Sequence, residues 1–359
     1  MTQQRKKRGF RFYLNIITII AVILLIWFAR HNLAKAWSLL SQVNIWWLLL
    51  LVPLQITVYY SMSEIGMSYL ERRKQMKKQR WWTKAIIALE LNFVNHVLPS
   101  GGASGFSYGL WRMKGLGVET VHATMGQLVR TIISFVAFAP LLIVAAFWIA
   151  ITDQGHGTIV MVATAASCAL ISSVIVGSYL MSSRKRTVNF VNWATKTVNR
   201  IVKKVTFGRE KTILSPERMA EHANNFHGDF VGLIKDKKAL RKPFVWGIIL
   251  LLAEVSMFEV TFMAMGAFVD PMVLLLAYGA SCVAGFVVFT PGGAGAYEAT
   301  FILVLIANGV DGGVASAGTL LTRVILVIGT VATGYYFYHK AINRKNLAEQ
   351  HLHRPRIKH

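Results

Sequence analysis

The chain has 359 residues, of which 54% are hydrophobic and only 15% are charged. Soluble domains carry about 25% charged residues, so the composition excludes an ordinary soluble domain and indicates a polytopic helical membrane protein. The formal net charge of +23 would suit nucleic acid, but it is confined to a few connecting segments, and we expect no nucleic-acid partner.

Several apolar runs are long enough to cross about 30 Å of hydrocarbon as helices, which takes about 20 residues. In chain order they are Phe12–Phe28, Ile45–Glu64, Val121–Ala150, Ile159–Met181, Phe244–Phe268 and Val314–Tyr338. Residues 1–11 are basic, like the start of a signal peptide. No small-residue cleavage site follows the first run, however, so a retained first span is predicted.

Lysine and arginine are concentrated in a few segments, and this distribution predicts the orientation. The basic segments are residues 1–11, 71–84, 184–243 and 339–359, whereas residues 31–44, 152–158 and 308–313 are nearly free of positive charge. Basic loops stay on the cytoplasmic side. We therefore expect a multi-pass protein of the cell membrane with both termini in the cytoplasm.

This orientation requires the chain between Lys84 and Val121 to start and finish on the same side of the membrane. The apolar run Ala85–Leu98 would form a helix of about 21 Å, too short for a crossing, so a re-entrant hairpin is predicted there. The segment from Pro271 to Asn308 must likewise return to its starting side. Both of its arms are long enough to cross, so a hairpin and two full spans remain alternatives.

The two hairpins share a proline and glycine break, in "LPSGGASGFSYG" and "FTPGGAGAYEAT". Each break is followed, at almost the same spacing, by an arginine inside an apolar span: Arg130 and Arg323. We therefore predict an inverted repeat of two halves, residues 12–150 and 159–338, each with three full spans and one broken hairpin. The second half is divided into residues 159–183, a cytoplasmic segment 184–243, and residues 244–338, before a cytoplasmic tail 339–359. Interrupted helices that meet near the bilayer midplane are a common way to build a transport site.

Arg130 and Arg323 are the predicted binding residues for a phosphate, because guanidinium groups bind phosphate through two parallel hydrogen bonds. Glycine breaks can add backbone N–H donors and helix N-termini that attract anions. The glycines concerned are Gly101, Gly102, Gly292, Gly293 and Gly295. The alternative is that each arginine only neutralises a buried carboxylate.

The acidic residues of the apolar segments are candidates for charge or proton coupling, since ionisable groups inside a membrane usually serve function. They are Glu90, Glu254, Glu259 and Glu298. Cys168 and Cys282 each lie in an apolar run and are read as packing residues. No cofactor, metal site or catalytic residue is predicted.

The cytoplasmic segment contains a basic amphipathic helix, with apolar residues from Val191 to Val205 at alternating three and four spacing among lysines and arginines. Such a helix suits the inner membrane surface and its anionic headgroups. A second helix is predicted from Ser215 to Asp236.

The residues "TPGGAGAYEA" and the arginine span that follows resemble the lysylphosphatidylglycerol synthase transmembrane family of flippase-like proteins. Its pattern of roughly P-G-G-x-G-x-x-E-A is matched from Pro291 to Ala299, and its first-half motif by the stretch from Asn95 to Arg130. Residues 102–105, "GASG", depart from the family, many members of which carry an acidic residue there. The soluble aminoacyl-transferase domain of the full-length synthases is absent from this sequence, so the resemblance implies the lipid-translocating part.

The resemblance implies a flippase-like transporter that moves an anionic or aminoacylated phospholipid, or an isoprenoid-linked lipid, between leaflets. One alternative is an integral-membrane transferase that uses Glu298 or Glu90 as a general base. Another is a non-catalytic membrane partner of a lipid or envelope enzyme, which it would recruit through residues 184–242. A homo-oligomer is also compatible with the sequence.

Overall fold

A computed structural model describes most of the predicted membrane region. The described residues are 43–98, 102–151, 183–205, 236–287 and 293–352, with a few isolated helical residues between 172 and 180. Within these ranges the chain is helical and contains no strand. The predicted span Phe12–Phe28, most of the span Ile159–Met181, the helix after Ser215, Gly101 and Gly292 lie outside the described residues.

The first half of the described chain contains a short helix, two long helices and, between those two, a pair of short helices. These are α2 (Ile45–Leu49), α3 (Leu51–Arg72), α4 (Trp81–Val97), α5 (Ala103–Gly115) and α6 (Thr120–Ile151). The rest repeats the order of long, short, short and long after a separate basic helix. These elements are α8 (Arg184–Val205), α10 (Lys237–Ala264), α11 (Pro271–Val287), α12 (Ala296–Ala307) and α13 (Gly312–Leu352).

Among the described residues, four helical stretches are long and apolar enough to cross a membrane. They are Ile45–Arg72, Thr120–Ala145, Lys238–Ala264 and Gly312–Asn343. The predicted all-α membrane architecture is therefore confirmed. The helices extend beyond the apolar runs at their polar ends: α10 begins at Lys237, where the side chain of Asp236 accepts a hydrogen bond from the backbone N–H of Ala239.

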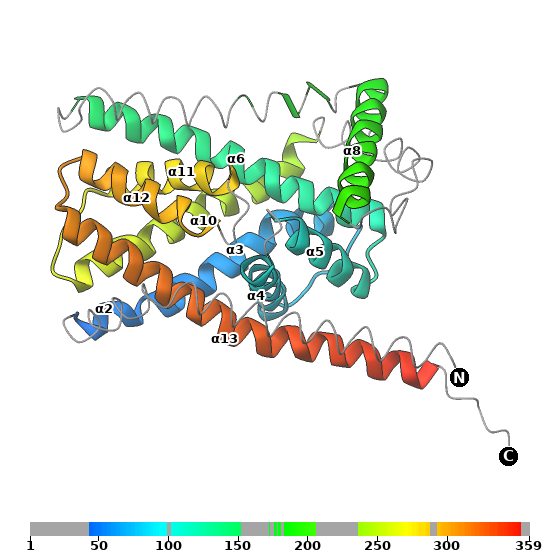
Figure 1. Ribbon diagram of the computed structural model, residues 1–359. Coiled ribbons are helices and arrows are strands. Elements are labelled where there is room, and N and C mark those ends of the chain that lie inside the picture. Colours follow the sequence, from blue (N-terminus) through cyan, green and yellow to red (C-terminus); the bar gives the residue numbers. More distant parts are fainter. Residues whose placement is uncertain are drawn as a thin grey trace, which may run out of the picture.

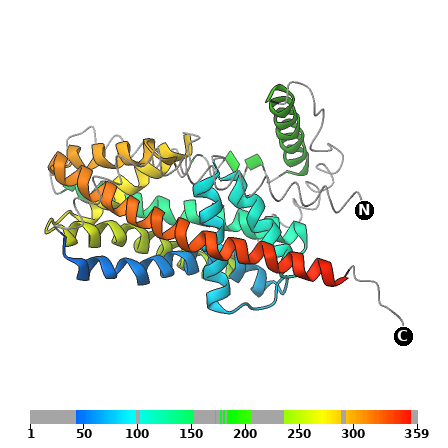
Figure 2. The ribbon, with the colours of Figure 1, turned by 60° about the horizontal axis from the view of Figure 1, so that its bottom comes forward.

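Over their described residues, the paired short helices are shorter than the four long ones. At 1.5 Å per residue, the 17 residues of α4 and of α11 rise about 25 Å. The 13 residues of α5 and the 12 of α12 rise about 20 Å and 18 Å. Figure 1 shows α4 and α5 towards one end of an elongated bundle and α11 and α12 towards the other, and Figure 2 shows the same separation after rotation.

The long helices form the framework that holds these pairs. Helix α10 packs along α3 more extensively than along any other described helix, and α6 contacts α3, α10 and α11. Helix α13 runs past both pairs, contacting α4 and α12 (Figure 1). Figure 2 shows helix α8 apart from this bundle.

Two glycines allow α3 and α6 to approach closely. A Cβ atom on Gly66 would lie 2.6 Å from the carbonyl oxygen of Gly126 and 3.7 Å from the Cβ atom of Arg130. Any larger residue at position 66 would push the helices apart. The glycine pair thus places Arg130 directly against the surface of α3.

The second helix of each pair begins at a glycine with a positive φ angle, which other residues rarely adopt. Gly102 (φ 90°) precedes α5 and Gly295 (φ 91°) precedes α12. Gly293 also has a positive φ, 71°, and packs against the backbone of Gly285 in α11. The glycines of the two sequence breaks are therefore required by the turns that connect the short helices.

Candidate membrane-embedded site

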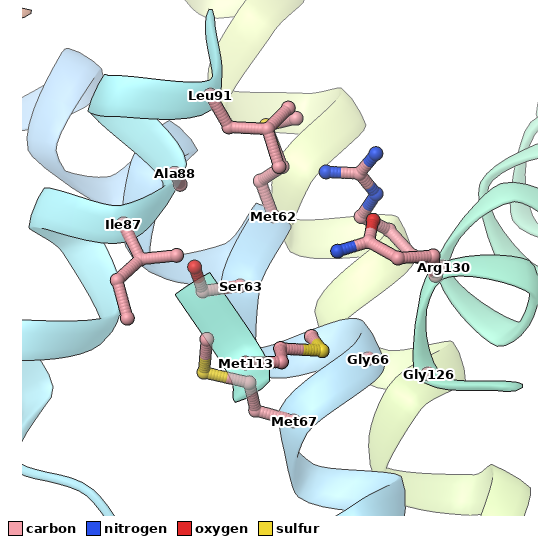
Figure 3. Close-up of a pocket in the computed structure, with 11 residues that line it drawn as sticks. Met62, Ser63, Gly66, Met67, Ile87, Ala88, Leu91, Met113, Gly126 and Arg130 are labelled. Carbon is pink, nitrogen blue, oxygen red and sulfur yellow. The ribbon is translucent and has the colours of Figure 1, made fainter. Parts of the chain in front are cut away.

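Arg130 lines a small pocket between α3, α4, α5 and α6. The side chain extends from α6 into the space that faces Met62 and Leu91 (Figure 3). Three methionines and several small or aliphatic residues form most of the wall; the full lining is Met62, Ser63, Gly66, Met67, Ile87, Ala88, Leu91, Met113, Gly126, Gln127 and Arg130. Arg130 is half-buried, and its guanidinium group forms no hydrogen bond or ion pair with any residue of the described chain.

Polar neighbours in this pocket are few. Gln127 is only 3% exposed, and its Oε1 atom has no hydrogen-bond partner among the described residues. The hydroxyl of Ser63 donates to the backbone carbonyl of Lys84, 2.6 Å away. A positive charge in mainly apolar surroundings is costly unless it is compensated, and no residue of the described chain compensates Arg130 by an ion pair.

Arg323, the corresponding arginine of the second half, is in a different situation. Its Nε atom donates to Oε1 of Glu298 at 2.8 Å, and its guanidinium lies 4.3 Å from the ring centroid of Tyr297. The two charged side chains are 19% and 14% exposed. The ion pair joins α13 to the first turn of α12. Arg323 and Glu298 therefore neutralise each other, which is the alternative to phosphate binding that the sequence left open.

More ionisable side chains gather around Arg323 from other helices. Glu254 of α10 and Cys282 of α11 both lie within electrostatic range of Arg323. His96, near the end of α4, interacts with both Arg323 and Glu298. Its Nδ1 atom lies 2.8 Å from the carbonyl oxygen of Asn92. The end of α4 and the start of α12 are therefore close in space, although nearly 200 residues separate them in the sequence.

Glu90 is paired with an arginine that the sequence analysis did not single out. Arg112 of α5 donates from Nε to Oε2 at 2.5 Å and from Nη2 to Oε1 at 3.2 Å, while the Tyr108 hydroxyl donates to Oε2 at 3.0 Å. Glu90 itself is 1% exposed. These bonds connect α4 to α5, which shows that Glu90 fastens the first pair of short helices.

The starts of α5 and α12 are both capped by side chains of the protein. The Glu298 carboxylate accepts a hydrogen bond from the backbone N–H of Gly295 at 2.6 Å. The Asn95 side chain accepts one from the backbone N–H of Gly105 at 2.9 Å. A helix N-terminus favours a negative or electronegative group, and here the chain supplies it.

A second charge network was not predicted from the sequence. Lys84, 2% exposed, lies 2.8 Å from Glu64 and 2.9 Å from Glu71, and Lys242 lies 3.2 Å from the other oxygen of Glu64. The Tyr60 hydroxyl also donates to Glu64, at 2.7 Å. This network connects α3, α4 and α10 beside the Arg130 pocket. The sequence signal that could have pointed to this network is Glu64, a charged residue within the apolar part of α3.

The structure thus places the charged residues predicted for the site in four different surroundings. Arg130 lies in its own pocket, whose lining does not include Arg323. Glu298 and Glu254 lie around Arg323, and Glu90 lies between α4 and α5. Glu259 is half-buried on α10 and forms no hydrogen bond or ion pair with a described residue. No cluster of metal ligands occurs among the residues searched, which are the described ones.

Comparison with known proteins supports the resemblance noted in the sequence. The profile of a family described as the lysylphosphatidylglycerol synthase TM region matches residues 15–334. This match includes every described helix from α2 to α12 and the first part of α13, up to residue 334. No curated protein matches the chain.

Proposed function

The chain belongs to the lysylphosphatidylglycerol synthase transmembrane-region family, and from that premise we propose that it is a lipid translocase. Its substrate is an anionic or aminoacylated phospholipid, or an isoprenoid-linked lipid, which it moves between the leaflets of the cell membrane. The family match supports a lipid-related membrane function, and the residues described above support the more specific activity.

The observation that carries the proposal is the Arg130 pocket. Arg130 is positively charged, half-buried and without an ionic partner among the described residues. A lipid phosphate offers two oxygen atoms in the geometry that a guanidinium binds. The acyl chains would remain in the bilayer while the phosphate of the headgroup contacts Arg130 at the pocket that α3, α4, α5 and α6 line.

The arrangement of helices supports an inverted repeat with two re-entrant hairpins. Each short pair lies between two long, apolar helices, and the described part of each arm rises about 25 Å or less, against about 30 Å of hydrocarbon. We place both termini in the cytoplasm, as the basic segments indicate. In this orientation the hairpins enter from opposite faces, and their ends meet around Arg323 and His96.

The same contacts favour a translocase over a transferase. A general base must be within reach of a substrate proton, but Glu90 and Glu298 are each engaged by an arginine. Membrane lipids are therefore the proposed partners, with anionic headgroups at the basic helix α8. An oligomeric state or an enzyme partner is not part of this proposal.

The test is lipid translocation in proteoliposomes reconstituted with purified protein. Fluorescent phosphatidylglycerol, its aminoacylated form and a polyprenyl phosphate are compared, for wild type and for Arg130→Ala and Arg130→Lys. A charge-assisted bidentate contact contributes about 1.5–3 kcal/mol, so Arg130→Ala should weaken lipid binding roughly ten- to hundredfold. Arg130→Lys keeps the charge without the fork and should retain part of the activity.

Arg72→Ala is the matched control, because Arg72 is an exposed arginine at the end of α3. It should translocate lipid at the wild-type rate. Folded protein that moves none of these lipids, or an Arg130→Ala variant with the wild-type rate, would contradict the proposal.

A further inference from the structure

We propose that Glu254 is a proton-binding site which couples lipid movement to a proton gradient. This inference rests on the proposed translocase function and assigns one residue to its coupling. The other carboxylates that the sequence offered for this role are Glu90, Glu259 and Glu298. The side chains around Arg323 distinguish Glu254 from them.

Charge balance around Arg323 is the first step. The guanidinium group donates directly to Glu298 at 2.8 Å, so that pair is neutral as it stands. Glu254 is a second carboxylate near the same arginine. Phe258, one turn further along α10, stacks on Tyr297 with the ring centroids 6.5 Å apart, and Arg323 lies 4.3 Å from the centroid of that Tyr297 ring. If both carboxylates were ionised, the cluster would carry an uncompensated negative charge inside the membrane, where such a charge is strongly unfavourable. A proton on Glu254 removes it.

The neighbours of Glu254 supply no other cation among the described residues. The ionisable side chains that face it or its cluster come from each helix packed around this part of α10. They are Tyr59 of α3, His96 of α4, Cys282 of α11, Tyr297 and Glu298 of α12, and Arg323 of α13. Arg130 of α6 lies in the separate pocket, and α2 has no ionisable residue. Arg323 is thus the one positive charge that these residues place near Glu254.

Glu254 is also unengaged, unlike the paired acids. It forms no hydrogen bond or ion pair with the described part of the chain, and it is half-buried. Glu90 is held by Arg112 and Tyr108, and Glu298 by Arg323 and the backbone of Gly295. A proton can bind to and leave Glu254 without breaking an ion pair.

The location of Glu254 explains how a proton would be coupled to transport. The cluster joins the end of α4 to α12 and α13, the places where the two halves meet. A conformational change that exposes the cluster to the other side of the membrane is favourable when it is neutral and unfavourable when it is charged. Protonation of Glu254 on one side and release on the other would therefore drive the change in one direction.

The first experiment detects the proton itself and needs no lipid substrate. Full-length protein in nanodiscs is examined by infrared difference spectroscopy, in H₂O and D₂O, between buffers of about pH 6 and about pH 9, where carboxyl groups with the ordinary pKa of about 4 stay ionised. We expect a carboxyl C=O band that shifts in D₂O and disappears in Glu254→Gln. It should persist in Glu119→Gln, which alters an exposed carboxylate (81% exposed). A band that survives in Glu254→Gln, or that disappears in Glu259→Gln instead, would overturn the assignment whether or not lipid moves.

The second experiment tests the coupling in proteoliposomes with an imposed pH difference. One pH unit corresponds to a tenfold ratio for one proton, so wild type should change its lipid distribution between leaflets about tenfold per unit. Glu254→Gln should equilibrate lipid without responding to the gradient. If wild type moves lipid but does not respond to pH, or responds only to a sodium gradient, the coupling is refuted while the translocase function stands. If no lipid moves at all, the translocase proposal fails, and the infrared result alone decides the assignment of Glu254.

Discussion

The ion pair between Glu298 and Arg323 offers a quantitative test of how the second short pair is held. We consider three variants: Glu298→Gln, Arg323→Met and the double substitution. Glutamine keeps an oxygen that can accept the hydrogen bond from Gly295, so Glu298→Gln removes the charge and leaves the helix cap in place. Methionine approximates the length of the arginine stem.

The expected magnitude follows from the burial and the geometry. The two side chains are 14% and 19% exposed, and the Nε–Oε1 distance is 2.8 Å. Removing one partner of a buried pair typically costs about 3–5 kcal/mol, because the other charge stays behind. The double variant leaves neither charge, so it should be less destabilised than the sum of the single variants. A coupling energy of about 1.5–3 kcal/mol is expected, the value of a charge-assisted hydrogen bond.

The assay is reversible unfolding in mixed micelles, in which the free energy of unfolding of each variant is compared with that of wild type. A control cycle combines Arg323→Met with Glu119→Gln, whose carboxylate is exposed and remote in sequence. That cycle should be additive. A coupling energy below about 0.5 kcal/mol for Glu298 and Arg323 is within ordinary additivity, and it would refute the view that this pair fastens α12 to α13.

Three further substitutions test the contacts that position the site, each by the same unfolding measurement. Lys84→Met should destabilise the protein by about 3–5 kcal/mol, because it leaves two carboxylates without their buried partner. In the control Lys78→Met, at an exposed lysine, the free energy of unfolding should stay within about 0.5 kcal/mol of the wild-type value. Gly66→Ala should cost about 1–3 kcal/mol, because its Cβ would lie 2.6 Å from a carbonyl oxygen of α6; Gly115→Ala, with open space around it, should be neutral. Asn95→Ala should cost about 1–3 kcal/mol through the backbone N–H that it leaves unbonded at the start of α5.

Much of the fold could be predicted from the sequence because the membrane simplifies the problem. A helix is the only structure that satisfies its own backbone in hydrocarbon without closing a barrel. Apolar runs such as Val121–Ala150 and Val314–Tyr338 therefore indicate helices, which are present as α6 and α13. The glycine breaks were equally readable, since Gly102 and Gly295 adopt the φ angles that only glycine tolerates well.

The pairing of charges could not be predicted in the same way. Arg112 lies 22 residues from Glu90 in sequence, and whether the two meet depends on the angle between α4 and α5. The buried network of Lys84 and Glu64 likewise depends on how α4 packs on α3. Residue spacing predicts which face of one helix a side chain occupies, but not which side chain of another helix lies opposite.

The two arginines that follow the glycine breaks have different chemical surroundings. Arg130 and Arg323 follow their glycine breaks at almost the same spacing, yet only the second break carries a glutamate at its helix start. Glu298 reaches back to Arg323, whereas residues 102–105 at the corresponding place in the first half contain no acid. The absence of that acid leaves Arg130 without an ionic partner among the described residues. The departure from the family pattern thus leaves the first half with a positive charge, to which the proposed function assigns the headgroup. Around Arg323, by contrast, Glu298 and Glu254 are two carboxylates for one arginine, and the proton that we propose on Glu254 would neutralise the excess charge.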